Sequence, residues 1–311
     1  MKIRKKIQMY NEFGFKVAFA SFCSSAFRHP MAITRWKDKV FIEYLEKNYK
    51  NVIQKYKSFN FNQNNAQESS SNNLIWSIWW QGEENAPEVV KACFASVRRH
   101  CGDKKFKVIT EKNFREYIQL PEHILKKVNA GVITLTHLSD ILRMYLLYYY
   151  GGLWLDSTIF VVSDISDEIF KTEYFSIKTG FNPKSYAVTM GRWASFLQFA
   201  HKGSALCRFA LECQLEFWKE HTIPIDYILI DYFFALAYQN FPEVKNMIDS
   251  VPLNNPEIET LRQLLNSQWD EEKFAALIRS TTFFKLTWKH KFEKNISGRE
   301  TFYGHIINSV K

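Results

Sequence analysis

Residues 139–160 constrain the fold of this chain more than any other stretch, because a periodic apolar segment there ends in two glycines and a short apolar run follows at once. Gly151 and Gly152 supply the left-handed backbone that ends a helix and turns the chain. Residues 153–155 are too few for a second helix and predict a central strand, with Asp156 just past it, where open α/β sheets gather their ligand chemistry. The helix before the glycines is predicted from apolar side chains at i, i+3, i+4 and i+7 spacing: Leu138, Ile141, Leu142, Tyr145, Leu146 and Tyr149.

Three charged side chains lie in or beside this apolar stretch, namely Asp140, Arg143 and Asp156. Buried charge is costly unless it is paired or bound to a metal or a ligand. Taken separately, Asp140 and Arg143 could form an ordinary surface ion pair, and Asp156 could be a turn or N-cap residue. Ser157 and Thr158 add hydroxyl groups beside Asp156, and a carboxylate with neighbouring oxygen ligands is what a hard divalent cation needs.

The sequence SDILRMYLLYYYGGLWLDST at residues 139–158 resembles the core signature of the capsular polysaccharide synthesis proteins. These are similar to glycosyltransferase family 32, with its pattern S-D-x-x-R followed by G-G-x-Y-x-D-x-D. The resemblance covers about residues 74 to 290, most of the chain. Outer blocks resemble the family in the same order, at residues 75–100, 111–131, 225–234 and 283–290.

The resemblance implies a nucleotide-sugar-dependent glycosyltransferase of the hexosyltransferase type, with the A-type, Rossmann-like fold and retention of anomeric configuration. It implies a UDP-linked donor, a capsular or other cell-surface glycan as acceptor, and a Mn²⁺ or Mg²⁺ ion held by the aspartates of the D-x-D motif. By the same resemblance, Asp140 and Arg143 contact the nucleotide-sugar. Gly151 and Gly152 would let the backbone approach it.

The chain departs from the family pattern at one place. Its motif reads Asp156-Ser157-Thr158, so a threonine stands where the family has its second aspartate. Asp156 remains as a metal ligand, and Thr158 could ligate through its hydroxyl or through a bound water. Related enzymes often bring a late histidine onto the metal, which makes His305 a candidate third ligand; the alternative is an ordinary surface or core histidine. The departure keeps a second function open, a non-catalytic nucleotide-sugar-binding or glycan-binding component of a polysaccharide assembly complex.

Four further side chains are candidates for donor binding. Lys285 and Lys289 could contact the phosphates or be ordinary surface charges. Asp231 could stabilise an oxocarbenium-like transition state near the anomeric carbon, or it could lie on a helix surface or cap. Trp79, in the first predicted strand, could stack on a uracil base or a sugar ring, or belong to the core.

The sequence lacks residues that the motifs of other enzyme classes require. A strand that ends in Asp-Ser-Thr lacks the second aspartate of haloacid dehalogenase phosphatases, because Thr158 stands there. The same threonine replaces the glycine that aspartic proteases need. The sequence contains no G-x-x-x-x-G-K-S/T loop, H-E-x-x-H helix or G-x-S-x-G elbow.

The basic character belongs to the first 58 residues, which hold 13 Lys and Arg against 4 Asp and Glu, while the whole chain holds 41 against 32. This basic and aromatic segment could lie on an anionic membrane surface, where it would serve a lipid-linked acceptor, or it could form a helical pair packed on the catalytic domain. No recognition motif for nucleic acid accompanies the charge.

No apolar run reaches the roughly 18 residues of a spanning helix. Five cysteines without a C-x-x-C pair favour a reducing compartment, so the expected location is the cytoplasm, free or peripheral on the inner face of the cell membrane.

We expect a basic helical extension at residues 1–57, a polar linker or loop at 58–73 and a glycosyltransferase domain at 74–311. The predicted fold class is α/β, a Rossmann-like A-type glycosyltransferase sandwich with a helix-rich C-terminal half. Further strands are predicted at 74–80, 105–110, 174–178 and 186–190. Helices are predicted at 87–100, 111–118, 121–129, 193–201, 204–220, 226–240, 257–267 and 270–279.

Overall fold

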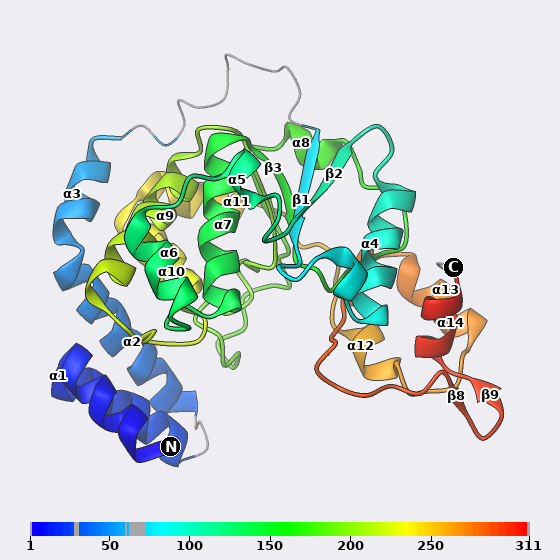
Figure 1. The fold of residues 1–311 in the computed structure, drawn as a ribbon, viewed down its shortest axis with the longest axis horizontal. Helices are drawn as coiled ribbons and strands as arrows, with labels where there is room; N and C mark the ends of the chain where they lie inside the picture. Colours follow the sequence, from blue (N-terminus) through cyan, green and yellow to red (C-terminus); the bar gives the residue numbers. More distant parts are fainter. Residues whose placement is uncertain (1, 28–30, 60, 62–72, 310–311) are drawn as a thin grey trace.

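The computed structural model describes residues 2–27, 31–59, 61 and 73–309, and at its centre is a five-stranded mixed sheet in the order β2-β1-β3-β6-β5 (Figure 1). Strands β2, β1 and β3 are parallel, β6 is antiparallel to β3, and β5 is antiparallel to β6. The α/β class predicted from the sequence is confirmed. The strands of this sheet are β1 (Leu74–Ile78), β2 (Lys105–Ile109), β3 (Gly152–Leu155), β5 (Tyr174–Ser176) and β6 (Leu197–Ala200). Two small antiparallel pairs are β4 (Ile159–Val161) with β7 (Phe283–Lys285), and β8 (Asn295–Ile296) with β9 (Arg299–Glu300).

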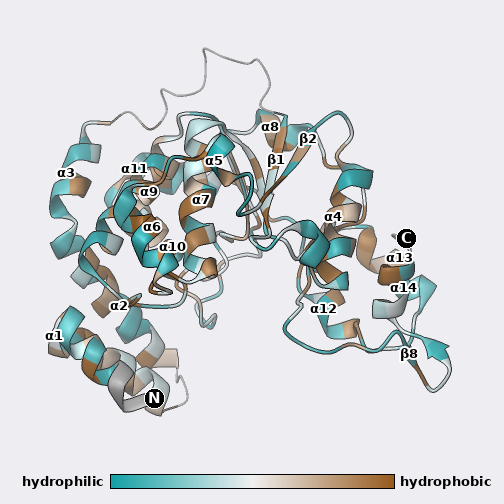
Figure 2. Ribbon diagram, in the orientation of Figure 1, coloured by the Kyte–Doolittle hydropathy of each residue, from teal (hydrophilic) through white to brown (hydrophobic). Residues whose placement is uncertain are grey.

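Helices cover both sides of this sheet. Figure 1 shows α7, α9 and α10 on one side with α1–α3 beyond them, and α4 with the C-terminal helices on the other. Figure 2 shows α7 as largely hydrophobic and α3 as largely hydrophilic, in keeping with their central and outer places. The helices are α1 (Lys2–Ala26), α2 (Met31–Asn48), α3 (Lys50–Lys57), α4 (Glu88–His100), α5 (Phe114–Tyr117), α6 (Glu122–Asn129), α7 (Leu135–Tyr149), α8 (Glu168–Lys171), α9 (Ala205–Glu220), α10 (Leu229–Asn240), α11 (Pro242–Ser250), α12 (Thr260–Leu264), α13 (Glu271–Ile278) and α14 (Phe302–Asn308).

The order of the parallel strands creates a switch point in the sheet. The chain leaves β1 through α4 to reach β2 on one side of it, then returns through α5, α6 and α7 to β3 on the other side. The carboxyl ends of β1 and β3 therefore lie side by side with their outgoing connections running in opposite directions. In open α/β sheets this is where ligands bind.

The N-terminal helices pack on the rest of the protein. Phe13 of α1 stacks on Phe217 of α9, with ring centroids 6.1 Å apart. On α2, Lys37 forms an ion pair of 2.7 Å with Asp226, and the carboxylate of Asp38 accepts a hydrogen bond of 2.6 Å from the Tyr232 hydroxyl. The described parts of α1 and α2 therefore pack against the domain, whereas contact with a membrane stays a prediction.

Two predicted elements are wrong. Residues 186–190 form turns rather than a strand, with Met190 at a φ of 50°. Residues 193–201 contain β6 rather than a helix. All four residues of β6 are buried, and a short apolar run buried on both faces has no period that separates a strand from a helix. The predicted elements also omit α11, although Pro242 stands at its first position.

Most of the predicted linker at 58–73 lies outside the described residues. Of the helices that are described, none combines the length and the apolar content needed to cross a bilayer.

Candidate active site

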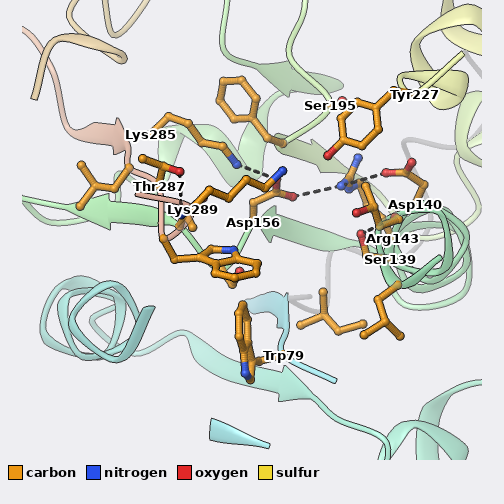
Figure 3. Close-up of a pocket in the computed structure, with 18 of the residues that line it drawn as sticks. Trp79, Ser139, Asp140, Arg143, Asp156, Ser195, Tyr227, Lys285, Thr287 and Lys289 are labelled. Carbon is orange, nitrogen blue, oxygen red and sulfur yellow. Dashed lines mark hydrogen bonds and ion pairs between the residues drawn. The ribbon is translucent and has the colours of Figure 1, made fainter. Parts of the chain in front are cut away.

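A cavity of about 590 Å³ opens at the switch point. Its wall comes from the chain that follows β1 and β3, the first half of α7, the start of α10 and the segment that follows β7. The volume falls within the roughly 300–1,000 Å³ of small-molecule sites. Figure 3 shows cationic and carboxylate side chains from these separate elements converging on it.

Asp156 is the centre of the polar cluster. Its Oδ1 accepts hydrogen bonds from Nη2 of Arg143 (3.0 Å) and from Nε1 of Trp154 (2.9 Å), and its Oδ2 accepts one from Nζ of Lys285 (2.7 Å). Burial raises the pKa of Asp156, but the Lys285 and Arg143 cations outweigh burial and hold this pKa below its ordinary value. Asp156 is therefore an ionised carboxylate held between two cations.

Arg143 joins two carboxylates and keeps donors to spare. Its side chain is only 3% exposed, and its Nη2 lies 3.3 Å from Oδ1 of Asp140 as well as 3.0 Å from Asp156. The guanidinium also lies over the Trp154 ring, 5.0 Å from its centroid. Its Nε and Nη1 are buried and have no hydrogen-bond partner within the described part of the chain. Buried donors are normally satisfied, so these two point to a ligand with acceptor oxygens.

Asp140 and Asp231 are two further buried carboxyl groups on the cavity wall. Burial raises the pKa of Asp140 to about 7; Arg143 opposes this, while Asp156 and Asp231 add to it. Asp231, in the first turn of α10, accepts hydrogen bonds from Nε1 of Trp193 (3.0 Å) and from Oγ of Ser195 (3.4 Å). Burial raises the pKa of Asp231 to about 6. Asp231 is only 6% exposed, so it does not lie on a helix surface.

Residues 25–306 match the family model described as capsular polysaccharide synthesis protein. The chain belongs to this family. Among solved structures it is similar to one described as "PaToxG Glycosyltransferase", at 14% identity and a TM-score of 0.41, over 70% of this chain and 90% of that chain. No curated protein matches the sequence.

Of the three metal ligands expected in this capsular polysaccharide synthesis protein, Asp156 and Thr158 lie together on the cavity wall and His305 does not. His305 lies on α14, outside the cavity wall, where its ring stacks on Trp269 at 3.6 Å and its Nδ1 lies 3.3 Å from Glu300. Thr158 does line the cavity beside Asp156. No group of three His, Cys, Asp or Glu side chains in the described ranges is arranged to hold a metal ion. Both oxygens of Asp156 are already bonded to cations, so these residues do not fit the divalent ion that a D-x-D motif holds.

The paired glycines serve the sheet rather than the ligand. Neither lies on the cavity wall, and Gly152 is the first residue of β3, at the opposite end from Asp156. A Cβ on Gly152 would lie 2.4 Å from the carbonyl oxygen of Leu74, and its φ is 108°. The carbonyl of Gly151 accepts a hydrogen bond of 2.9 Å from Nε1 of Trp76. The glycines thus let β3 lie against β1, which in turn sets the position of Asp156.

Aromatic rings also line the cavity. Trp79 meets Trp288 edge to face, with centroids 5.6 Å apart, and both line the cavity. The Trp79 Nε1 is buried without a partner in the described ranges. Lys289 lies with its Nζ 5.6 Å from the Tyr227 ring centroid. Sequence reasoning missed Tyr227, Trp288 and Ser195. Tyr227 and Trp288 were within reach, because they lie in the 225–234 and 283–290 blocks of the family resemblance.

Proposed function

We propose that this protein is a glycosyltransferase that moves a sugar from a UDP-linked donor to a capsular or other cell-surface glycan. The observation that supports this best is the pairing of Asp156 with Arg143 and Lys285 in the cavity at the switch point. Two more buried carboxyl groups, Asp140 and Asp231, lie beside it. Membership of the capsular polysaccharide synthesis family supports the same conclusion.

Cations on the cavity wall suit the diphosphate. Arg143, Arg262, Lys285 and Lys289 line the cavity, and Arg262 is partnered by Glu259 at 2.8 Å. Charge-assisted bonds to phosphate oxygens are the strong ones, and an Arg with two unused donors can give two. Trp79 and Trp288 then offer surfaces on which the base stacks.

The carboxyl groups suit the sugar. Asp140, with a pKa of about 7, can donate to or accept from sugar hydroxyls. Asp231, with a pKa of about 6, is mostly ionised at neutral pH and would stabilise positive charge on the anomeric carbon.

The transfer replaces one bond to the anomeric carbon by another. The bond from the anomeric carbon to the β-phosphate oxygen breaks, and the diphosphate leaves with the electron pair. An acceptor hydroxyl oxygen bonds to the same carbon, and its proton passes to the departing phosphate oxygen. Retention, which the family resemblance implies, follows if the acceptor approaches on the face from which the diphosphate leaves.

The test is release of UDP from a panel of UDP-sugars by purified protein, without acceptor and with capsular oligosaccharides. We expect slow release from one donor, faster with acceptor, and lost in Asp156→Ala. Asp103→Ala, which changes a side chain that is 77% exposed, should leave release unchanged. If no UDP-sugar is turned over yet one binds, the protein is the non-catalytic binding component that the Thr158 departure keeps open.

The α1–α2 pair is proposed to rest on an anionic bilayer, where a lipid-linked acceptor would be presented. Phe15, Phe19 and Phe22 share one face of α1 at i, i+4 and i+7, and they are 68%, 45% and 41% exposed. Trp36 of α2 extends this face, 6.1 Å from Phe19. Exposed aromatic rings on a basic segment bind anionic interfaces by shallow insertion and charge.

Cosedimentation with vesicles tests this face. We expect binding to vesicles that contain phosphatidylserine, weaker binding to pure phosphatidylcholine, and loss of binding when Phe15, Phe19 and Phe22 are all changed to Ser. Ile296→Ser removes an exposed apolar side chain of the β8–β9 hairpin and is the matched control. Equal binding by the triple variant and the control would refute the assignment.

A further inference from the structure

We propose that Lys285 supplies to the donor diphosphate the positive charge that a divalent ion supplies in D-x-D enzymes, so that donor binding and transfer need no metal. This inference rests on the proposed function, and it concerns how the same site holds the leaving group. It arises from the mismatch between the expected metal ligands and the side chains that surround Asp156.

The fold positions Lys285 at Asp156. Lys285 is the last residue of β7, which pairs with β4 so that Lys285 lies opposite Ile159, three residues beyond Asp156. The pairing brings Nζ to 2.7 Å from Oδ2 of Asp156, while Nη2 of Arg143 lies 3.0 Å from Oδ1. A metal ion bound to Asp156 would need one of these oxygens at roughly 2.0–2.6 Å. It would therefore compete with a cation that the strand pairing already holds in place.

The charge balance of the site agrees with this substitution. A motif with two aspartates and a divalent ion sums to no net charge. Here Thr158 removes one carboxylate, and Lys285 carries one positive charge in place of two. The Asp156–Lys285 pair is again neutral, so the exchange of aspartate for threonine and the lysine compensate each other. With a second carboxylate at position 158, which is only 7% exposed, the two carboxylates and Lys285 would carry a net negative charge.

Donors remain for the phosphates after the Asp156 contacts are made. An ammonium group has three N–H donors, and Asp156 takes one from Lys285, which leaves two. Arg143 adds its unpartnered Nε and Nη1. Lys289, also on the cavity wall, forms no ion pair with the described residues. As the bond to the anomeric carbon breaks, Nζ of Lys285 would donate a hydrogen bond to the β-phosphate oxygen that receives the electron pair. This would stabilise the negative charge on that oxygen, as a metal ion does by acting as a Lewis acid in metal-dependent enzymes.

Calorimetric titration of UDP into the wild-type protein, in EDTA and then in Mn²⁺, tests the inference without any variant. We expect the same affinity in both. Binding that requires Mn²⁺ would overturn the inference and leave the proposed function standing. Absence of UDP binding under both conditions would overturn the proposed function as well.

Variants sharpen the test. Lys285→Ala should weaken UDP binding roughly 10- to 100-fold, the worth of a charge-assisted hydrogen bond, while Lys285→Arg retains most of it. Lys273→Ala, on the exposed side of α13, should bind as the wild type does. The double variant Thr158→Asp, Lys285→Ala rebuilds a two-carboxylate motif, and its UDP affinity should rise when Mn²⁺ is added. Unchanged affinity in a folded Lys285→Ala protein would refute the assignment.

Discussion

Replacing Asp140 by Asn should remove much of the pH dependence of stability. Asp140 is 7% exposed and has a pKa of about 7 when folded, against about 3.9 in an unfolded chain. Between these values the folded state binds a proton that the unfolded state does not, so the stability that protonation provides is lost as pH rises through the folded pKa. From pH 5 to pH 8 the group is ionised in the unfolded chain, while the folded protein keeps the proton over about two pH units, up to its own pKa. At about 1.36 kcal/mol per unit, the free energy of unfolding falls by about 3 kcal/mol. Asn cannot ionise, and its amide oxygen can still accept from Arg143.

Urea unfolding followed by tryptophan fluorescence at pH 5 and pH 8 measures this difference. Wild-type stability should fall with pH by about 3 kcal/mol more than that of Asp140→Asn. Asp231, whose pKa of about 6 acts in the same direction, is present in both proteins and contributes to both pH profiles. Asp103→Asn, at a side chain that is 77% exposed, should follow the wild type. Parallel pH profiles for Asp140→Asn and the wild type would refute the placement of Asp140 as a buried, raised-pKa carboxyl group.

Three more predictions follow from the contacts of the site. Arg143→Lys should lower stability by roughly 3–5 kcal/mol in urea unfolding and abolish UDP release, because one ammonium group cannot bridge Asp140 and Asp156 as the guanidinium does; release at the wild-type rate would contradict this. Gly152→Ala should cost at least about 2 kcal/mol in the same assay, because its Cβ would meet the Leu74 carbonyl at 2.4 Å and its φ is 108°; a stable protein would show that β1 and β3 can separate. Trp79→Ala should weaken UDP binding roughly tenfold by calorimetry if the base stacks there, and unchanged affinity would place the base elsewhere.

The local sequence pattern was sufficient to predict the elements at the centre of the fold. The apolar spacing before Gly151 predicted α7, the two glycines predicted its end, and the short apolar run predicted β3 with Asp156 just past it. The same stretch carries Asp140 and Arg143, so one local pattern included three charged members of the polar cluster. The physical reason is that helix periodicity and glycine turns act over a few residues and can be seen without knowing the rest of the chain.

Contacts between distant segments could not be predicted in this way. The ion pair of Lys285 with Asp156 joins residues 129 positions apart and depends on the pairing of β7 with β4. Lys285 was named as a phosphate contact, but nothing local distinguished it from surface charge. His305 shows the opposite error, because a late histidine looks like a ligand until its helix places it against Trp269. The sequence predicts a helix where β6 lies, because full burial erases the alternation of a half-buried strand.

Calorimetry with UDP and with uridine tests the central claim most directly, because the two ligands share the base and the ribose and differ in the diphosphate. Cations held at Asp156 should make UDP bind at least roughly tenfold more tightly than uridine, and Lys285→Ala together with Arg143→Lys should bring the two affinities together. Equal affinity of the wild-type protein for UDP and uridine would contradict the claim that this cluster grips a diphosphate.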